Sequence, residues 1–374
     1  MNRIKTVGLP IMRKEKNEVR GFLPSFVTEL TDYGVETYME YGYGKGMGIK
    51  DEVYLKENSQ AIHLVSHEEA YKQDLVIVLR APNFDELALM RRRAGLVAML
   101  HYKSRPRLVQ ELKKYGIISY SLDSMVDDNN QRLVVSYETT AWNGVHIAFK
   151  KLEKRRGDFY SPNREPFWVA IMGMGNLGIQ AGRASFRFGD ERMFKKIAKH
   201  KLPGVSVAYL EKEVTYCTDF ISNLFTKVDV LIDATKRIDF TKYIIPNNLL
   251  GNLKKDALIL DLTCDPYDTS VNPIQVKAIE GIPTGTLDQY IFEVNDPAWD
   301  KIPDGVSTIN RRVVISCNAW PGITPKQTMQ IYGEKIIPFT KLLIEKGHSL
   351  SLQSDNLVER VLCRSTLTNS GVNP

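Results

Sequence analysis

Continuous apolar runs alternate with amphipathic stretches along the first 120 residues. The runs at 4–9, 36–40, 75–79, 96–100 and 117–120 are rich in apolar and β-branched residues and predict strands. The stretches between them, at 22–33, 67–71, 86–94 and 106–115, repeat apolar residues at helical spacing. Uninterrupted apolar strands that alternate with helices are typical of a parallel sheet covered on both faces.

The same alternation restarts after a polar break at 127–130. A long helical stretch over 137–152 leads to an apolar run at 167–172, and further strands are expected at 228–232, 257–262 and 313–317. A last helix is expected over 325–346. The pattern therefore predicts an α/β protein with two Rossmann-like domains, parallel sheets and an interdomain cleft. Residues 1–136 plus 323–374 would form one domain, to which the C-terminal helix returns, and residues 137–322 the other.

A glycine motif follows the strand expected at 167–172. The sequence Gly173-Met174-Gly175-Asn176-Leu177-Gly178 has GxGxxG spacing and opens a helical stretch. In such a motif the first glycine permits a tight turn, the second admits a pyrophosphate and the third lets helix and strand pack closely. The helix start offers free N–H groups to the phosphates. We therefore expect a dinucleotide site, against the alternative of a structural glycine turn. Residues 137–322 would then be the dinucleotide-binding domain, and residues 1–136 plus 323–374 the substrate domain.

The charge after this helix bears on the choice between NAD and NADP. An acidic residue at the tip of the second strand would favour NAD. If that tip falls near 194–196, it is basic. Arg192, Lys195 or Lys196 would then hold the 2′-phosphate of the cofactor. This placement favours NADP(H) over NAD(H). The alternative, weighed nearly equally, is a solvated helix beginning at Glu191, with 205–210 as the true second strand.

Composition excludes several other classes of protein. The chain has 374 residues, 43% hydrophobic and 25% charged, which is typical of a globular protein. The net charge of +6 comes without a dense basic stripe, so no nucleic-acid partner is expected, and Arg91–Arg93 is interpreted as a solvated face. The four cysteines and six histidines lack metal-ligand spacing. No run approaches the roughly 20 apolar residues of a membrane span, and a cytoplasmic protein without a metal is expected.

Several further segments, spread through residues 1–346, resemble one family. The chain is similar to the group that contains alanine dehydrogenase, saccharopine dehydrogenase and N5-(carboxyethyl)ornithine synthase. The segments that carry this resemblance are VGLP at 7–10, NEVR at 17–20, GYGKGMGI at 42–49, DLVIVLRAP at 74–82, GLVAMLH at 95–101, DLTCD at 261–265 and NAWPGITP at 318–325.

The resemblance implies roles for four residues. Arg20 would bind the carboxylate of a keto acid, which a guanidinium matches with two N–H donors. His101 would be the general acid/base, and Asp265 would lie near the nicotinamide or cap the turn before Pro266. Arg80 stands where the family has a lysine. Because arginine stays protonated, Arg80 would clamp an anion or form a structural ion pair rather than carry a proton.

The expected function follows from these roles. We expect an NAD(P)H-dependent oxidoreductase that reductively aminates a pyruvate-like α-keto acid with ammonia or the amino group of an amino acid. The basic segment near Lys195 favours the carboxyethylornithine synthase branch over alanine dehydrogenase. Two alternatives stay open: an NADP-binding sensor with altered chemistry, which Arg80 favours, and a dinucleotide-dependent lyase or cyclodeaminase. The resemblance also implies a homo-oligomer.

Overall fold

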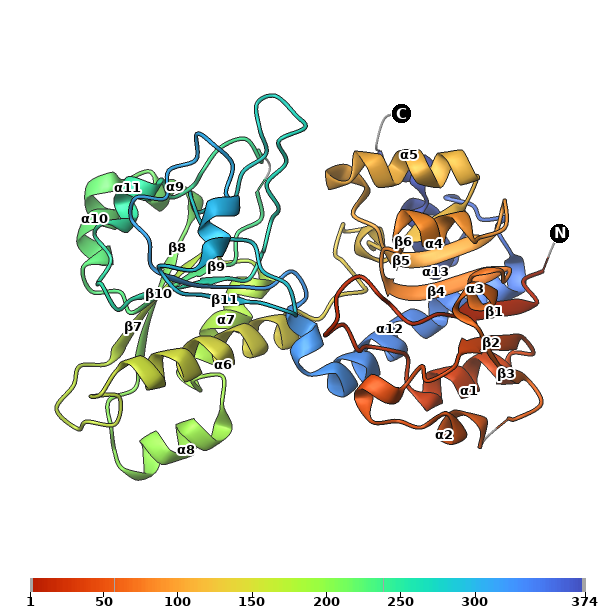
Figure 1. Ribbon diagram of the computed structural model, residues 1–374, viewed down its shortest axis with the longest axis horizontal. Helices are drawn as coiled ribbons and strands as arrows, with labels where there is room; N and C mark the ends of the chain where they lie inside the picture. Colours follow the sequence, from red (N-terminus) through yellow and green to blue (C-terminus); the bar gives the residue numbers. More distant parts are fainter. Residues whose placement is uncertain (1–2, 57, 238, 372–374) are drawn as a thin grey trace. The chain divides into compact units, whose positions relative to one another are not determined.

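The computed structural model describes residues 3–56, 58–237 and 239–371. The chain divides into two compact units. Unit 1 comprises Met1–Ser136 and Thr324–Pro374, and unit 2 comprises Tyr137–Ile323. Each unit contains a six-stranded sheet with helices packed on it (Figure 1), so the predicted α/β class with two parallel sheets is confirmed.

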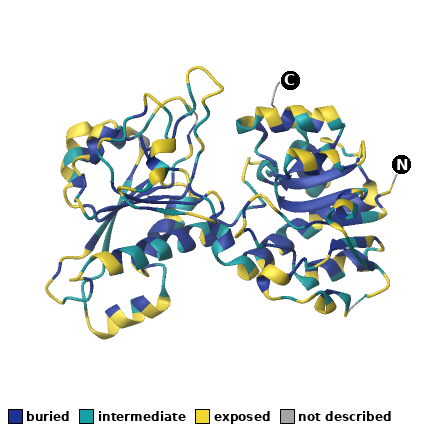
Figure 2. Ribbon diagram, in the orientation of Figure 1, coloured by how far each residue is buried: buried dark blue, intermediate teal, exposed yellow. Residues whose placement is uncertain are grey.

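The sheet of unit 1 is parallel throughout and has the order β3-β2-β1-β4-β5-β6. Its strands are β1 Thr6–Leu9, β2 Glu36–Glu40, β3 Ile62–Val65, β4 Leu75–Arg80, β5 Gly95–Met99 and β6 Ile118–Ser121. The apolar runs predicted every strand except β3, whose half-buried sequence IHLV is short and interrupted by a histidine. The central strands are buried on both faces (Figure 2), which explains their continuous apolar sequence.

The helices of unit 1 begin and end at recognisable signals. They are α1 Pro24–Asp32, α2 Asp51–Leu55, α3 His67–Tyr71, α4 Phe84–Ala88, α5 Pro106–Tyr115, α12 Pro325–Lys346 and α13 Leu357–Ser365. Three of them start with proline, whose fixed φ suits the first turn. The helix α12, drawn in blue in Figure 1, packs on α1, so the C-terminal helix returns to unit 1 as predicted.

The sheet of unit 2 has the order β11-β12-β10-β9-β7-β8, and only β11 is antiparallel. Its strands are β7 Phe167–Met172, β8 Val205–Leu210, β9 Val230–Asp233, β10 Leu258–Asp261, β11 Ile291–Phe292 and β12 Val313–Ser316. Its helices are α6 Tyr137–Arg155, α7 Asn176–Phe186, α8 Glu191–Lys199, α9 Lys212–Thr215, α10 Thr218–Phe225 and α11 Asn247–Leu250. The strand order reverses between β7 and β9, which is where ligands bind in open parallel sheets.

Candidate functional site

The glycine motif of unit 2 forms a tight turn between β7 and α7. Gly173 has φ +93°, a conformation that other residues rarely adopt. A Cβ atom at Gly178 would lie 2.0 Å from the carbonyl oxygen of Gly173, so only glycine lets α7 approach β7 this closely. A Cβ atom added to Gly175 would meet no atom within 4 Å. This open cradle fits a pyrophosphate.

The first residues of α7 supply donors to the same cradle. Asn176 and Leu177 are the first two helical residues after Gly175. The N–H groups at a helix start have no acceptor within the helix and carry a partial positive charge. The turn and the helix start therefore provide what a dinucleotide phosphate requires.

The basic residues predicted at the second strand tip lie elsewhere. The segment from Glu191 to Lys199 is helix α8, capped by Asp190, whose Oδ1 accepts the N–H groups of Arg192 (2.8 Å) and Met193 (3.1 Å). Arg192, Lys195 and Lys196 are therefore helical residues and do not end a strand. The prediction that they lie at this tip is wrong, because the Asp190 cap and the amphipathic spacing favour a helix. Their proposed contact with a 2′-phosphate loses its structural basis.

The second strand is β8, and an acidic residue follows it. β8 pairs in parallel with β7 from Phe167↔Val205 to Met172↔Leu210. Glu211 comes directly after Leu210 and precedes α9. It thus occupies the position from which a carboxylate binds the ribose hydroxyls of NAD. The alternative prediction, a helix that begins at Glu191 with 205–210 as the second strand, is therefore confirmed, although the sequence interpretation assigned no role to Glu211.

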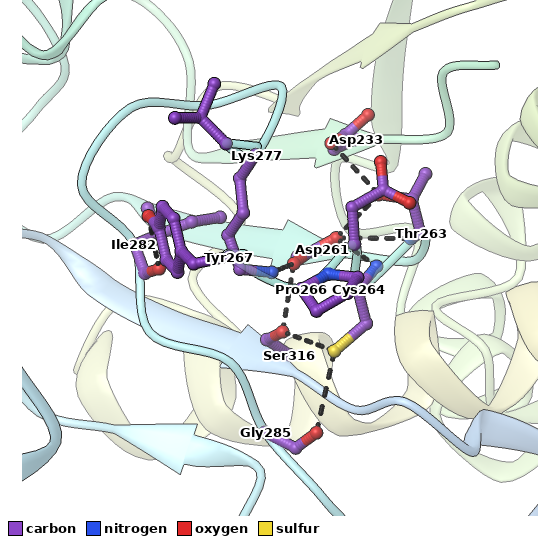
Figure 3. A network of polar contacts seen from close by, with 12 residues as sticks. Asp233, Asp261, Thr263, Cys264, Pro266, Tyr267, Lys277, Ile282, Gly285 and Ser316 are labelled. Carbon is purple, nitrogen blue, oxygen red and sulfur yellow. Dashed lines mark hydrogen bonds and ion pairs between the residues drawn. The ribbon is translucent and has the colours of Figure 1, made fainter. Parts of the chain in front are cut away.

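A buried polar network lies at the carboxyl ends of β9 and β10 (Figure 3). Asp261 ends β10, and its Oδ2 accepts from Lys277 Nζ (2.7 Å) and Ser316 Oγ (2.9 Å). Its Oδ1 accepts the N–H groups of Cys264 (2.7 Å) and Thr263 (3.1 Å). Burial acts to raise the pKa of Asp261, but Lys277 and these donors hold it below its usual value. Asp261 is therefore a fixed, fully bonded anion.

Asp233 ends the neighbouring strand β9 and is also buried. It accepts from the N–H (3.0 Å) and the hydroxyl (2.7 Å) of Thr235, and its Oδ2 lies 3.3 Å from Thr263 Oγ1. Burial and the charge of Asp261 raise the pKa of Asp233 to about 7. The Thr263 hydroxyl lies within hydrogen-bond distance of both carboxylates, 3.0 Å from Asp261 Oδ1, but it has only one proton to donate. When Thr263 donates to Asp261, a protonated Asp233 can donate to the Thr263 oxygen.

Asp265, the predicted residue near the nicotinamide, is held by Arg237. Its Oδ2 lies 3.2 Å from Nε and 3.1 Å from Nη2 of this buried guanidinium. Burial raises the pKa of Asp265, against the opposing charge of Arg237. Asp265 is thus ion-paired four residues after Asp261, and its proposed contact with a ligand stays a prediction. Asp233 and Lys277 were missed, because nothing in their local sequence indicates that they meet Asp261.

The predicted residues of unit 1 meet at the carboxyl edge of its sheet. Arg80 is the last residue of β4, His101 follows β5 and Asp123 follows β6. Because these strands are neighbours and parallel, their ends lie at one edge. The loop after β1, which carries Arg20, belongs to the same edge.

His101 is held by Asp123. The His101 N–H donates to Asp123 Oδ1 (3.0 Å), and His101 Nδ1 lies 3.5 Å from Oδ2. Ser121 Oγ also donates to Asp123 (2.6 Å). Burial acts to raise the pKa of Asp123, but His101 and Ser121 together outweigh this effect and hold the pKa below its usual value, so the carboxylate is ionised.

Positive charges surround His101. Burial lowers its pKa, and Asp123 opposes this effect. Arg105, Arg132 and Arg80 lower the pKa further through their charges. The neutral imidazole is therefore favoured until an anion neutralises some of these guanidinium groups.

Glu18 binds both of the predicted anchor residues. Arg20 donates from Nε and Nη2 to the two oxygens of Glu18 (2.8 and 2.5 Å). Arg80 Nη1 lies 3.4 Å from Glu18, and Arg80 Nη2 lies 2.8 Å from Glu15. All four side chains are largely buried. The structure thus brings Arg20 and Arg80 together through two glutamates. The sequence interpretation included Glu18 in the NEVR motif without giving it a role, and it did not name Glu15.

Arg132 is a further cation that the sequence interpretation missed. Its Nη2 lies 3.9 Å from Met99 Sδ, and its Nε is buried without a hydrogen-bond partner among the described residues. A buried guanidinium N–H without a partner is costly unless a ligand completes it. In the described part of the chain, no group of three or more His, Cys, Asp or Glu side chains could hold a metal ion.

Comparison with known proteins is consistent with this geometry. Residues 11–139 match the family described as alanine dehydrogenase/PNT, N-terminal domain. Alanine dehydrogenase 1 of Staphylococcus aureus is 20% identical over 366 residues, which cover 93% of this chain and 91% of that protein. The chain is thus similar to the alanine dehydrogenases over nearly its whole length. The resemblance seen in its sequence motifs is therefore confirmed.

Two solved structures share the fold of this chain. An L-alanine dehydrogenase superposes with a TM-score of 0.71 at 19% identity, covering 96% of this chain and 94% of the other. A transhydrogenase from Sinorhizobium meliloti gives 0.63 at 14% identity, covering 97% of both chains. Within the described residues, no helix is long and apolar enough to cross a membrane.

Proposed function

We propose that this protein is an NAD(H)-dependent oxidoreductase that reductively aminates an α-keto acid. The observation that carries the proposal is the His101–Asp123 pair set among the guanidinium groups of Arg80 and Arg132. An imidazole beside several fixed cations suits a reaction that binds a carboxylate and moves protons at the neighbouring carbon. The dinucleotide cradle of unit 2 and the alanine dehydrogenase relatives support the same class.

The keto acid carboxylate would bind to the guanidinium groups of unit 1. Arg132 is the strongest anchor, because its buried Nε has no described partner. Arg20 and Arg80 share Glu18, so they would orient the substrate while their own positions stay fixed. This arrangement favours Arg80 as an anion clamp and leaves proton transfer to His101, since a guanidinium does not release its proton at neutral pH.

Carboxylate binding would prepare His101 for catalysis. The bound anion neutralises positive charge near the imidazole and therefore raises its pKa. An amine attacks the keto carbon, and a proton of the attacking nitrogen passes to the keto oxygen to give a carbinolamine. The protonated His101 then donates a second proton to this hydroxyl group, which leaves as water while the nitrogen lone pair forms the C=N bond. The resulting imine carbon becomes the hydride acceptor. When bound in unit 2, the reduced dinucleotide supplies this hydride.

Glu211 favours NAD(H) over NADP(H). A carboxylate at the end of β8 would accept hydrogen bonds from the ribose hydroxyls, and it would repel a 2′-phosphate. Asp265 and Arg237 would lie on the nicotinamide side, since they follow β10 and β9. The amine is ammonia or the amino group of an amino acid.

A second candidate is a dinucleotide-binding sensor with altered chemistry. The ion pairs of Arg80 with Glu15 and Glu18 favour it, because they also suit a purely structural arginine. This candidate predicts dinucleotide binding without turnover.

The deciding experiment is oxidation of NADH, and separately of NADPH, with pyruvate and ammonia, ornithine, lysine or arginine. We expect turnover with NADH and one amine. His101→Ala should lower kcat by about 100-fold or more with NADH affinity unchanged, whereas exposed His200→Ala should match the wild type. NADH binding with no turnover on any pair would favour the sensor, and normal turnover in His101→Ala would refute the assignment of this residue.

A further inference from the structure

A positively charged cavity lies at the opposite edge of the unit 1 sheet from His101. It has a volume of about 550 Å³. The charged and titratable residues that line it are Arg3, Asp74, Arg91, Arg92, Arg93 and His348. The sequence alone predicts a solvated face for Arg91–Arg93. It does not indicate a shared cavity, because Arg3 and His348 are far from this segment along the chain.

The position of these residues separates the cavity from the proposed substrate site. Arg3 precedes β1, Asp74 precedes β4 and Arg93 lies two residues before β5. The cavity is thus at the amino ends of the strands, whereas Arg80 ends β4 at its carboxyl end. A six-residue strand spans roughly 20 Å, so one ligand does not reach both sites.

Most of the positive charge in the cavity is not neutralised. Asp74 is engaged by Arg91 Nη2 (3.0 Å) and by the backbone N–H groups of Lys5 (3.0 Å) and Thr6 (3.1 Å). Arg3, Arg92 and Arg93 take part in no salt bridge with any residue that the structure describes. Grouping these guanidiniums around one hollow favours an anion.

The arginines are positioned by the backbone that carries them. A Cβ atom added to Gly116 would lie 3.2 Å from Arg92 Cζ, so the Arg92 guanidinium rests against this glycine. The backbone N–H of Arg93 donates to the Gly116 carbonyl (2.9 Å). Both contacts tie the arginine segment to the end of α5.

His348 adds an oriented donor. Its Nδ1 lies 2.9 Å from the hydroxyl of buried Tyr120, while its Nε2 makes no hydrogen bond with a described residue. If Tyr120 donates to Nδ1, the proton of the neutral ring is on Nε2. Burial lowers the pKa of His348 and the charge of Arg93 lowers it further, against the opposing charge of Asp74. A bound anion would therefore raise this pKa.

We propose that this cavity binds a small polyanion bearing two or more phosphate groups, held by Arg3, Arg92, Arg93 and His348. Guanidinium groups match phosphate oxygens with paired N–H donors. Three unneutralised arginines exceed what a single carboxylate requires. The volume lies within the roughly 300–1,000 Å³ of small-molecule sites.

The first test is calorimetric titration of the full chain with inorganic tripolyphosphate, in the presence of saturating NADH to occupy the dinucleotide cradle. We expect one saturable site per chain, weakened at least tenfold in Arg92→Gln/Arg93→Gln. The matched control is Lys50→Gln/Lys56→Gln, which removes two exposed charges near α2 of the same unit. Absence of saturable binding to the wild type, or equal weakening in both double variants, would overturn the proposal.

The second test follows the His348 imidazole by NMR, with the resonance assigned from His348→Gln. Tripolyphosphate should raise the pKa of His348 in the wild type and leave it unchanged in Arg92→Gln/Arg93→Gln. Citrate tests the phosphate preference: binding as tight as that of tripolyphosphate would overturn it. Near-wild-type turnover and melting temperature in the arginine variant would show that it folds.

Discussion

His101 and Asp123 are joined at two points across the ends of neighbouring strands. The backbone N–H of His101 lies 3.0 Å from Asp123 Oδ1, and the ring Nδ1 lies 3.5 Å from Oδ2. His101 has φ +49°, an uncommon conformation for a residue other than glycine. The carboxylate thus fixes both the backbone and the ring, and it directs Nε2 away from Asp123.

Replacing Asp123 should change the pH dependence of turnover. Asp123 raises the pKa of His101 against the lowering effect of burial. Asp123→Asn should therefore move the His101 limb of the kcat/KM profile to lower pH and reduce kcat by roughly 10- to 100-fold. The exposed control Asp85→Asn should keep the wild-type profile. An unshifted profile in Asp123→Asn would contradict a positioning effect of Asp123 on His101.

Arg80→Met tests whether this residue binds substrate or only stabilises the loop after β1. Removing the guanidinium takes a partner from Glu15 and Glu18, so we expect the free energy of unfolding to fall by about 1–3 kcal/mol. If Arg80 also clamps the keto acid, KM for the keto acid should rise about 10-fold or more, since a charged hydrogen bond contributes about 1.5–3 kcal/mol.

Two comparisons make the Arg80 result interpretable. Arg80→Lys keeps the charge and should retain more keto acid affinity than Arg80→Met. Arg107→Met, on an exposed face of α5, should match the wild type in KM and in denaturant midpoint. A loss of stability in Arg80→Met with KM unchanged would assign Arg80 a structural role alone.

Glu211 should determine the choice of dinucleotide. Glu211→Ser removes the carboxylate expected to bind the ribose hydroxyls, so KM for NADH should rise about 10-fold and the preference over NADPH should shrink. Glu213→Ser removes the same charge from an exposed position two residues later and serves as the matched control. Equal discrimination between the dinucleotides in wild type and Glu211→Ser would contradict the assignment.

The buried ion pair of Lys277 and Asp261 should matter for stability. Lys277→Met leaves Asp261 buried without its cation, which should cost about 3–5 kcal/mol in the free energy of unfolding. The double variant Asp261→Asn/Lys277→Met also removes the unpaired negative charge, so it should recover part of the lost free energy of unfolding. Lys242→Met, at a side chain that is 80% exposed, should change stability by less than about 0.5 kcal/mol. Denaturant unfolding measures all three variants.

Asp233 should make unfolding depend on pH. Its pKa is raised to about 7 from the ordinary 3.8, so between these pH values the folded protein binds more protons than the unfolded chain. Stability contributed by the protonated form is therefore lost as pH rises through this window. Asp233→Asn should gain stability relative to wild type between pH 5 and pH 8, as measured by melting temperature. Asp304→Asn, at an exposed position, should have the wild-type melting temperature at every pH. If the melting temperatures of Asp233→Asn and wild type differed by the same amount at every pH, the raised pKa of Asp233 would be refuted.

Local sequence patterns predicted those elements whose formation depends on neighbouring residues. The apolar run Phe167–Met172 and the helix Pro325–Lys346 form as expected. The helix α8 shows the limit of this approach. The basic segment at 192–196 was compatible with a strand tip or with a solvated helix. Because β8 pairs with β7, the second strand is β8 and the basic segment is helical.

The sequence by itself determined the α/β class, the glycine turn at Gly173 and the place of His101 just after a strand, because periodicity and backbone freedom are properties of short segments. Only the tertiary structure decided which charges meet. Lys277 reaches Asp261 across 16 residues, and Asp123 reaches His101 from the next strand. A charge interacts through space with whatever folding brings near it, and a side chain's burial depends on the whole core. The partners and pKa shifts of this protein are therefore consequences of its fold.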